Sequence, residues 1–298
     1  MIINKPGNVT DRIVLLGRKE SNVYILKGDG EYAMVGGGMA HVIPDIIEQI
    51  RKFNIEEEKI KRIFILHAHF DHCGIVPYFK KRWPWAKVTA SARAKEFLST
   101  PKVIESINFM NQALLDRYGL KNKAEFFGFL PFEVEVEAVV GEGDVISCGG
   151  LLMEILDVPG HSSCSIAVYI PGEKAMFASD AGGIPFGDKI MTAANSNFDK
   201  YQESLKKMAS YDVEIFLPEH FGARTGEDGR NYLKRSIEFA DESRATLEES
   251  LKQTRDLNKS TEEITDRLMA EAPEDFLPRE VMSMVVGQML KFLSRRMG

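Results

Sequence analysis

The sequence predicts an α/β protein in which two mixed sheets pack together, with helices on their outer sides. Strand-like stretches followed by helical ones occur in the first half of the 298-residue chain and again in the second. From residue 226 onward the apolar spacing is helical only, and no low-complexity linker precedes this region. A chain of this length can bury a sizeable core. We therefore expect the C-terminal helices to pack on the sheets.

The composition is that of a soluble globular protein, with 44% hydrophobic and 28% charged residues. A formal net charge of −6 argues against a nucleic-acid partner. No apolar run approaches the roughly 18–20 residues of a membrane span, and no signal-peptide pattern opens the chain. The three cysteines, Cys73, Cys148 and Cys164, are scattered, which favours reduced thiols. We therefore expect a cytoplasmic protein without a membrane partner.

The first half of the chain alternates short strands with helices, and glycines mark the breaks. Gly17 and the turn at 28–30 separate the first three strands, and three glycines at 36–38 end the third. The expected strands are 11–16, 21–27, 32–35, 63–66 and 86–89, and the expected helices are 42–53, 75–83, 92–98 and 103–118. The apolar side of the last helix consists of Val103, Ile107, Met110, Leu114 and Tyr118.

The pattern changes after Pro131, where Val134, Val136 and Ala138 alternate with glutamates. This alternation predicts a half-buried strand over 133–138. Further strands are expected at 151–156, 165–170, 174–179 and 213–217, with a helix at 198–208.

Three helices are expected at the C-terminus, the first of them over 231–257. Ser260 and Glu263 form a capping box that starts the second. Pro278 suits the first turn of the third, which ends near Arg296. That helix is apolar almost all round, so it must be covered on more than one side.

Metal-binding residue types concentrate in one stretch, 62–74, just after a short apolar strand. His67, His69, Asp71 and His72 lie within six residues of one another. In an extended chain His67 and His69 project from the same side, and the following turn can bring Asp71 and His72 to the same volume. Two groups of ligands in one place predict a site for two metal ions.

Three more candidate ligands, His161, Asp180 and His220, each follow a predicted strand and have a glycine nearby. A rigid sheet can aim such side chains into one cleft. The remaining histidine, His41, fits no place in this set. We interpret it as a polar residue near the start of a helix.

Taken in order, the motifs His-X-His-X-Asp-His, Gly-His, Ser-Asp and Pro-Glu-His resemble those of the metallo-β-lactamase-fold hydrolases. The resemblance implies a four-layer αβ/βα sandwich with a dinuclear site at one edge of its two sheets. It also implies a catalytic domain at 1–225 and a C-terminal helical cap at 226–298, packed over the active site. It assigns His67, His69 and His161 to the first metal, Asp71, His72 and His220 to the second, and Asp180 as the bridge. Asp71 and Asp180 are the candidate catalytic residues.

The ligand types narrow the chemistry that the resemblance implies. Two divalent transition-metal ions are expected, and nitrogen and oxygen ligands suit zinc, iron or manganese. The oxygen-reducing flavo-diiron branch of the superfamily usually has a glutamate in place of His69, so this chain points to hydrolysis. Secreted β-lactamases are a poor match because no signal peptide is apparent.

The whole chain is similar to the PqsE-type 2-aminobenzoylacetyl-coenzyme A thioesterases. The matching runs are 69–78, 275–278, 289–290 and 293–295. This resemblance implies that the C-terminal helices roof the metal site and form a mostly apolar acyl pocket. Met282, Met284 and Met289 are candidates for its lining, although core packing is the commoner role of any one of them.

In such a site a bridging water is acidified toward a pKa of about 7, and the hydroxide attacks a carbonyl group. A thiolate leaves with little help, whereas an amine needs a proton donor, for which no spare histidine is available. We therefore expect a hydrolase of a small thioester or ester, with a small-molecule acyl substrate. The alternatives are a lactonase, a phosphodiester hydrolase, or a regulatory protein with incidental hydrolysis. The oligomeric state is left open, with a homodimer among the choices.

Two features stand apart from the motifs. Relatives commonly have an Asp-X-Gly run where this chain has glycines at 36–38, so a carboxylate that supports the ligand histidines is expected to be missing. Lys80, Lys81 and Arg82 form a basic cluster that could meet coenzyme A phosphates. A solvated face is the favoured interpretation of this cluster.

Overall fold

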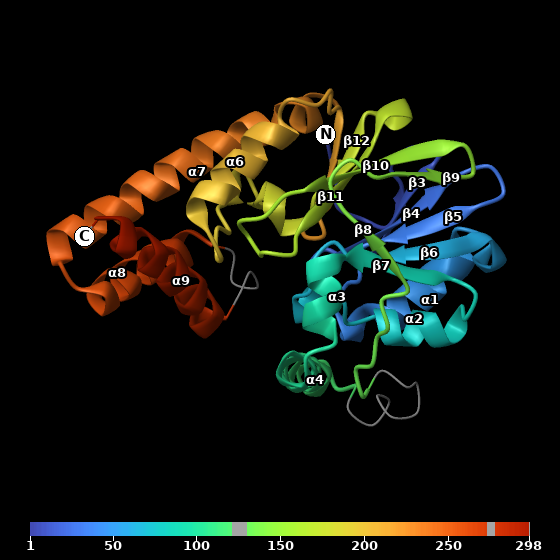
Figure 1. The fold of residues 1–298 in the computed structure, drawn as a ribbon, viewed down its shortest axis with the longest axis horizontal. Helices are drawn as coiled ribbons and strands as arrows, with labels where there is room; N and C mark the ends of the chain where they lie inside the picture. The colour runs from blue at the N-terminus through green and yellow to red at the C-terminus, as the bar shows by residue number, and fades with distance from the viewer. Residues whose placement is uncertain (121–129, 273–277, 298) are drawn as a thin grey trace.

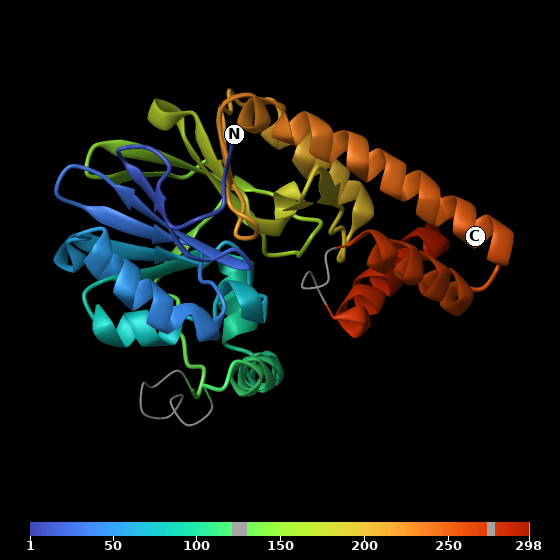
Figure 2. The same ribbon diagram turned by 180° about the vertical axis from the view of Figure 1, so that it is seen from behind.

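The computed structural model describes residues 1–120, 130–272 and 278–297. Within them two seven-stranded sheets pack together, as the sequence predicts, and helices cover their outer sides (Figures 1 and 2). A separate hairpin of β13 (Ile184–Phe186) and β14 (Lys189–Met191) lies outside both sheets. This hairpin was not predicted.

The first sheet changes from antiparallel to parallel halfway across. Its strands in order are β2 (Gly7–Asn8), β3 (Ile13–Arg18), β4 (Ser21–Lys27), β5 (Tyr32–Val35), β6 (Ile60–Phe64), β7 (Lys87–Ser91) and β8 (Ala138–Val140). The pairs from β2 to β5 are antiparallel and those from β5 to β8 are parallel. Parallel neighbours require crossover connections, which explains the helices that follow β5, β6 and β7.

The second sheet is mostly antiparallel. Its strands in order are β1 (Ile2–Ile3), β16 (Ala223–Arg224), β15 (Ile215–Leu217), β12 (Ala175–Phe177), β11 (Ile166–Ile170), β10 (Leu151–Asp157) and β9 (Val145–Cys148). Strands β12 and β15 are parallel neighbours. The connection between them contains the β13–β14 hairpin and the helix α6 (Phe198–Met208).

The helices of the two halves occupy opposite sides of the molecule (Figures 1 and 2). They are α1 (Ile43–Lys52), α2 (Val76–Arg82), α3 (Ala92–Leu98) and α4 (Pro101–Arg117), then α6, α7 (Gly226–Thr254), α8 (Leu257–Glu271) and α9 (Arg279–Met297). Short 3₁₀ helices are η1 (Ala40–Val42), η2 (Glu57–Lys59), η3 (Phe70–His72), η4 (Pro171–Glu173) and η5 (Ser179–Gly182). Helix α7 runs along α6, and α8 and α9 pack back against α7. No helix in the described ranges is long and apolar enough to cross a membrane.

The sheets are buried on both faces. In β3, Val14 and Leu16 pack toward the helices of the first half, whereas Ile13 and Leu15 face the second sheet. An apolar strand with this period of two is what a position between two layers requires. A third apolar cluster joins the second sheet to α6–α9. All three cysteines are buried and free, as predicted.

Some predicted elements differ from the structure in their bounds, and two of these differences have a clear local cause. The segment 133–137 keeps its alternating burial, but the strand β8 begins only at Ala138; at Glu137 the N–H donates to the Val88 carbonyl, while the side-chain carboxylate accepts the Val88 N–H (3.1 Å). Helix α8 begins at Leu257 rather than at Ser260. Asp256 caps it by accepting the N–H groups of the next turn, while Ser260 is buried inside the helix.

Candidate metal centre

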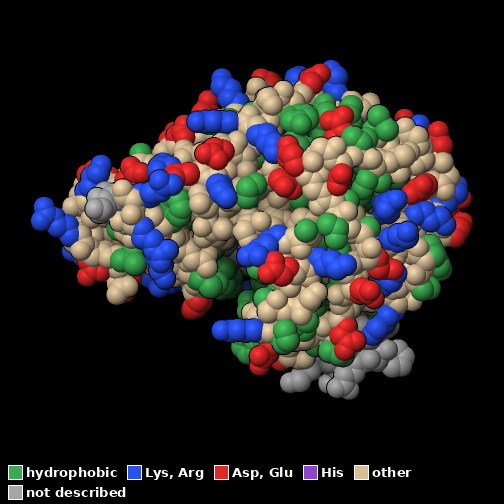
Figure 3. All heavy atoms as spheres, viewed as in Figure 1, with side chains coloured by type: hydrophobic (Ala, Val, Ile, Leu, Met, Phe, Trp, Pro, Cys, Tyr) green, Lys and Arg blue, Asp and Glu red, His purple; other side chains and the backbone are tan. Residues whose placement is uncertain are grey.

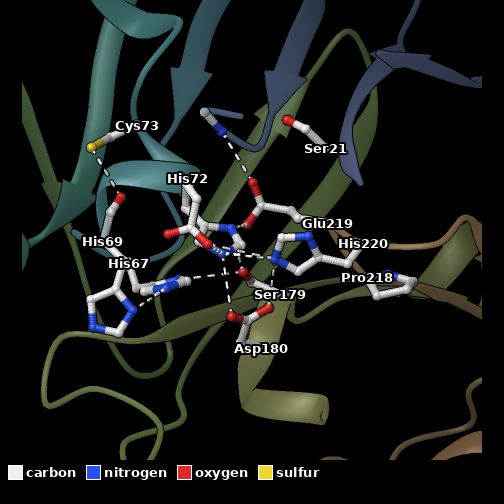
Figure 4. Close-up of polar contacts among 12 residues, drawn as sticks. Ser21, His67, His69, His72, Cys73, Ser179, Asp180, Pro218, Glu219 and His220 are labelled. Atoms are coloured by element: carbon white, nitrogen blue, oxygen red, sulfur yellow. Dashed lines mark hydrogen bonds and ion pairs between the residues drawn. The ribbon is translucent and has the colours of Figure 1, made fainter. Parts of the chain in front are cut away.

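The structure brings all seven predicted ligands together at one edge of the two sheets. His67 and His69 lie beyond the end of β6, which stops at Phe64 rather than at the predicted residue 66. Asp71 and His72 belong to η3, and His161 follows β10. Asp180 lies in η5 after β12, and His220 follows β15. In Figure 4 the side chains of His72, Asp180 and His220 point toward one another. Both sheets therefore contribute to the cluster.

The first group consists of three histidine rings. His67 Nε2 lies 3.1 Å from His69 Nδ1, and His161 Nε2 lies 3.2 and 3.0 Å from these two atoms. His161 Nδ1 must carry a proton because it donates to the Ala193 carbonyl (2.8 Å), so its Nε2 presents a lone pair. Three nitrogens on a tetrahedral ion with bonds of about 2.0–2.1 Å would be roughly 3.3 Å apart. The group has the size of a metal site.

The second group combines one carboxylate with two rings. His72 Nε2 lies 3.3 Å from Asp71 Oδ2 and 3.2 Å from His220 Nε2. His220 Nε2 is 3.8 Å from the same Asp71 oxygen. His220 Nδ1 donates to the Glu20 carbonyl (2.7 Å), so its Nε2 also presents a lone pair to this group.

Asp180 lies between the two groups. Its Oδ2 is 3.3 Å from His72 Nε2 and 3.5 Å from His161 Nε2, and its Oδ1 is 3.4 Å from His220 Nε2. One carboxylate oxygen therefore faces both groups. This is the position that a carboxylate bridging two ions requires.

The donor set fits transition-metal ions. Burial lowers the pKa of His69 to about 4, and the neighbouring histidines add to this effect. The same two causes, with burial the larger, hold the pKa of His67 well below its ordinary value. Burial also lowers the pKa of His161, against the effect of Asp180. These three rings are neutral nitrogen ligands at pH 7. Their ring nitrogens converge to within 3.0–3.2 Å of one another, and a cation placed among them would bind all three.

The second group carries more negative charge. Burial alone lowers the pKa of His72, but the carboxylates of Asp71, Asp180 and Glu219 outweigh it and hold that pKa well above its ordinary value. Burial raises the pKa of Asp180, yet His72 and His220 hold it well below the ordinary value. Buried carboxylates here require a positive charge, which either a proton on His72 or a metal ion provides.

A buried carboxylate, that of Glu219, lies beside His72, although the glycines at 36–38 predicted that no such group would be present. Its Oε2 lies 3.0 Å from His72 Nδ1, and its Oε1 accepts the Gly37 N–H at 3.1 Å. It is 2% exposed and directly precedes His220. Glu219 belongs to the Pro-Glu-His motif, but the sequence predicted no role for it. The glycine at position 36, where relatives commonly have Asp, was the sequence feature that could have pointed to a carboxylate from elsewhere in the chain.

His41 stays outside the ligand set, as interpreted from the sequence. It is buried in η1, just before α1, and its Nε2 lies 3.1 Å from Glu20 Oε1. Its ring stacks on Tyr118 with the centroids 4.0 Å apart.

A cavity of about 640 Å³ opens above the candidate ligands, between α4 and α9. Figure 3 shows a hollow where the C-terminal helices meet the rest of the molecule. The floor of the cavity includes five of the candidate ligands: His69, Asp71, His161, Asp180 and His220. Its apolar walls include Val103, Ile107 and Met110 of α4, Val281, Met284 and Val285 of α9, and Met39, Phe70, Met191 and Phe221. Helix α4 was predicted as an ordinary packed helix, so its place in the wall is new.

The expected pocket lining is only partly right. Met284 lines this cavity, but Met282 and Met289 line a separate one of about 260 Å³ beside the β13–β14 hairpin. The basic cluster does not line the cavity: Lys80 pairs with Glu137 and Arg82 with Glu57. Lys80 and Arg82 are half-buried in these ion pairs and only Lys81 is exposed, so the favoured solvated face describes Lys81 alone. Of the run 275–278 that resembles the thioesterases, 275–277 lie outside the described residues.

Comparison with known proteins agrees with this geometry. Residues 16–220 match the family model of the Metallo-beta-lactamase superfamily. The chain is 23% identical over 222 residues to the metallo-beta-lactamase fold-containing protein ST1585 of Sulfurisphaera tokodaii, covering 73% of this chain and 78% of that protein. It is 24% identical over 210 residues to the acyl-coenzyme A thioesterase MBLAC2 of Gallus gallus, covering 67% and 72%.

A solved structure shows the same fold. The metallo-beta-lactamase family protein TTHA1429 of Thermus thermophilus superposes with a TM-score of 0.68 at 17% sequence identity. The match covers 97% of this chain and 95% of that one, so it includes C-terminal helices as well as sheets. Because the family model spans more than half of the chain, the protein belongs to the metallo-beta-lactamase superfamily.

Proposed function

We propose that the protein is a dinuclear metal-dependent hydrolase of a small thioester or ester, with acyl-coenzyme A thioesters as the leading class. One observation carries the proposal: two ligand groups joined by Asp180 open directly onto a largely apolar cavity. In this proposal residues 1–225 provide the metal centre and residues 226–298 cap it. Zinc, iron and manganese all suit the ligands.

The chain's own residues would divide the work between holding the ions and meeting the substrate. His67 and His72 lie behind the cavity surface, whereas His69, Asp71, His161, Asp180 and His220 line it. Two bound ions would supply a nucleophilic hydroxide at neutral pH by lowering the pKa of a water. The Asp180 carboxylate, which faces both ligand groups, would fix their spacing. Proton donors on the Nδ1 atoms of His161 and His220 are bound to carbonyl groups, so these rings stay oriented.

The cavity favours an acyl substrate with a good leaving group. Its volume lies within the roughly 300–1,000 Å³ of typical small-molecule sites, and its walls are mostly apolar. The histidines among its described lining residues are all candidate ligands, and His41 lies behind Glu20. No imidazole is thus left to protonate an amine. A thiolate, with a pKa near 8.5, departs without that help.

The similarity to an acyl-coenzyme A thioesterase supports this substrate class. The narrower likeness to the PqsE-type 2-aminobenzoylacetyl-coenzyme A thioesterases belongs to the same proposal, supported by the apolar roof of the cavity. A cytoplasmic location and the absence of nucleic-acid and membrane partners are also proposed. The net charge of −6 supports the exclusion of nucleic acid.

A substrate panel tests the proposal. Protein reconstituted with zinc, iron(II) or manganese(II) is assayed with acyl-coenzyme A thioesters of several chain lengths, lactones, an anilide and bis-p-nitrophenyl phosphate. We expect thioester turnover well above that of the anilide and the phosphodiester, and its loss in Asp180→Ala. If only the phosphodiester or only the lactone is hydrolysed, the thioester proposal is wrong and that compound defines the substrate class. Binding of two ions without any turnover would favour a regulatory role.

A further inference from the structure

We propose that Glu219 is a positioning residue of the second ligand group and acts through His72. The proposal rests on the metal binding in the proposed function, but not on its substrate. Figure 4 shows Glu219 beside His72, on the opposite side of the ring from Asp180. Its Oε2 is 3.0 Å from His72 Nδ1, while His72 Nε2 faces Asp71 and Asp180. One side of the ring therefore meets a carboxylate and the other side meets the candidate metal position.

The contact decides which nitrogen of His72 keeps its proton. A carboxylate is an acceptor only, so Nδ1 must donate to Glu219. A neutral ring with its proton on Nδ1 has a lone pair on Nε2, the nitrogen that would bind the ion. Ser179 Oγ also lies 3.2 Å from His72 Nδ1, but a hydroxyl both donates and accepts and cannot make this choice.

Glu219 is itself held in place from several directions. Its Oε1 accepts the Gly37 N–H, and its backbone carbonyl accepts the Asn22 N–H at 2.7 Å. A Cβ on Gly36 would lie 2.6 Å from Glu219 Oε1, so the carboxylate occupies space that only a glycine leaves open. The glycines after β5 and the glutamate after β15 are thus two halves of one arrangement, which joins the two sheets beneath the metal centre.

The replacement Glu219→Gln separates positioning from packing. Glutamine keeps the size of the side chain, and its amide oxygen can still accept from Gly37. Its NH₂ group then faces His72 Nδ1, which must accept, and the ring proton moves to Nε2, where it opposes an ion. Glu214→Gln is the matched control, because Glu214 lies just before the same strand and pairs with Lys174 at the surface, away from the ligands.

The experiment measures zinc affinity of the metal-free proteins by competition with a chromophoric chelator, together with their melting temperatures. We expect Glu219→Gln to weaken the second ion by about 10–100-fold, the range for partners of ligand histidines. The first ion and the metal-free melting temperature should change little, and Glu214→Gln should match the wild type. Wild-type affinity for both ions in Glu219→Gln would overturn the proposal, as would equal weakening of both ions with a large drop in melting temperature.

A second measurement uses only the wild type, so it does not depend on the variant folding. Nitrogen-15 NMR of the zinc-loaded protein should show His72 bound through Nε2 and protonated at Nδ1. Zinc on Nδ1, or a proton on Nε2, would contradict the proposal. If the wild type binds no zinc at all, the proposed function fails instead. A wild type that binds two ions beside a variant that binds them equally well overturns only the role of Glu219.

Discussion

The floor and the roof of the cavity are built in different ways. The metal floor consists of seven candidate ligands from loops and 3₁₀ helices that follow strands of both sheets, and five of them line the cavity while His67 and His72 lie behind it. They are His67, His69, Asp71, His72, His161, Asp180 and His220. The apolar roof consists of Val103, Ile107 and Met110 of α4 and Val281, Met284 and Val285 of α9. The floor is held together by charged and hydrogen-bonding groups, whereas the six roof side chains are apolar and can contribute only packing. In the proposed function the floor would set the chemistry, and the roof would select the substrate.

Breaking the floor should have the largest effect. We expect His69→Ala to lose the first ion and to lower kcat/KM by more than the about 10–100-fold typical of a residue that only supports a ligand. The roof variant Met110→Ala should keep both ions. Metal content by mass spectrometry and thioester kinetics check both variants. Two ions retained in His69→Ala would remove His69 from the ligand set.

Acid should separate the two halves of the floor. The pKa of His69 is about 4, and those of His67 and His161 are also lowered, so between pH 7 and pH 5 these rings take up protons less readily than an ordinary imidazole. The affinity for the first ion should change little over this range. The pKa of His72 is raised, so at any pH below that pKa the second ion must displace a proton from His72. The affinity for the second ion should therefore fall about tenfold for each unit by which the pH is lowered. Zinc competition titrations from pH 5 to pH 8 measure both. Equal slopes for the two ions would contradict the assignment.

Changing the roof should alter which acyl chain is preferred. Truncation in Met110→Ala enlarges the cavity wall, and we expect the ratio of kcat/KM for longer over shorter acyl chains to rise about tenfold, since one methylene in an apolar pocket is worth about 10–200-fold. Phe109→Ala is the control, because Phe109 directly precedes Met110 in α4 but is 72% exposed and does not line the cavity. An unchanged chain-length profile in Met110→Ala would show that α4 does not contact the acyl group.

The smallest effect should come from changing a charge at the solvent-exposed edge of the cavity. Lys102 is the one cationic side chain among the described lining residues, and it is exposed. We expect Lys102→Glu to lower kcat/KM for an acyl-coenzyme A by a few-fold at low salt and by less at high salt, as a solvated charge would. Lys81→Glu changes the same charge on α2, outside the cavity. Equal effects of the two variants would exclude a specific contact at Lys102.

The sequence predicted the floor better than the roof, for a physical reason. Ligand histidines are few and must follow strand ends, so their motifs could be identified residue by residue. An apolar stripe shows that a helix is covered but not by what. Met282 and Met289 therefore could not be told from Met284, and α4 was interpreted as a packed helix although five of its residues line the cavity.

The same limit applies to smaller features. The alternation of sheet and helix follows from local patterns, and the helices and longer central strands were predicted, whereas the short strands β1, β2, β9, β13, β14 and β16 were not. The role of Glu219 depends on its distance to Gly36 and His72, which are far away in the chain. The start of α8 depended on a choice between two capping residues, Asp256 and Ser260, of similar strength. Only tertiary contacts could decide these cases.

X-ray diffraction from metal-reconstituted crystals, recorded at the absorption edge of the metal, tests the central claim most directly. We predict two anomalous peaks per chain, roughly 3.5–4 Å apart, with the Asp180 carboxylate between them. One peak should lie about 2.0–2.1 Å from His67 Nε2, His69 Nδ1 and His161 Nε2 if the metal is zinc. A single peak, or peaks away from these atoms, would contradict the dinuclear floor on which the proposed hydrolysis depends.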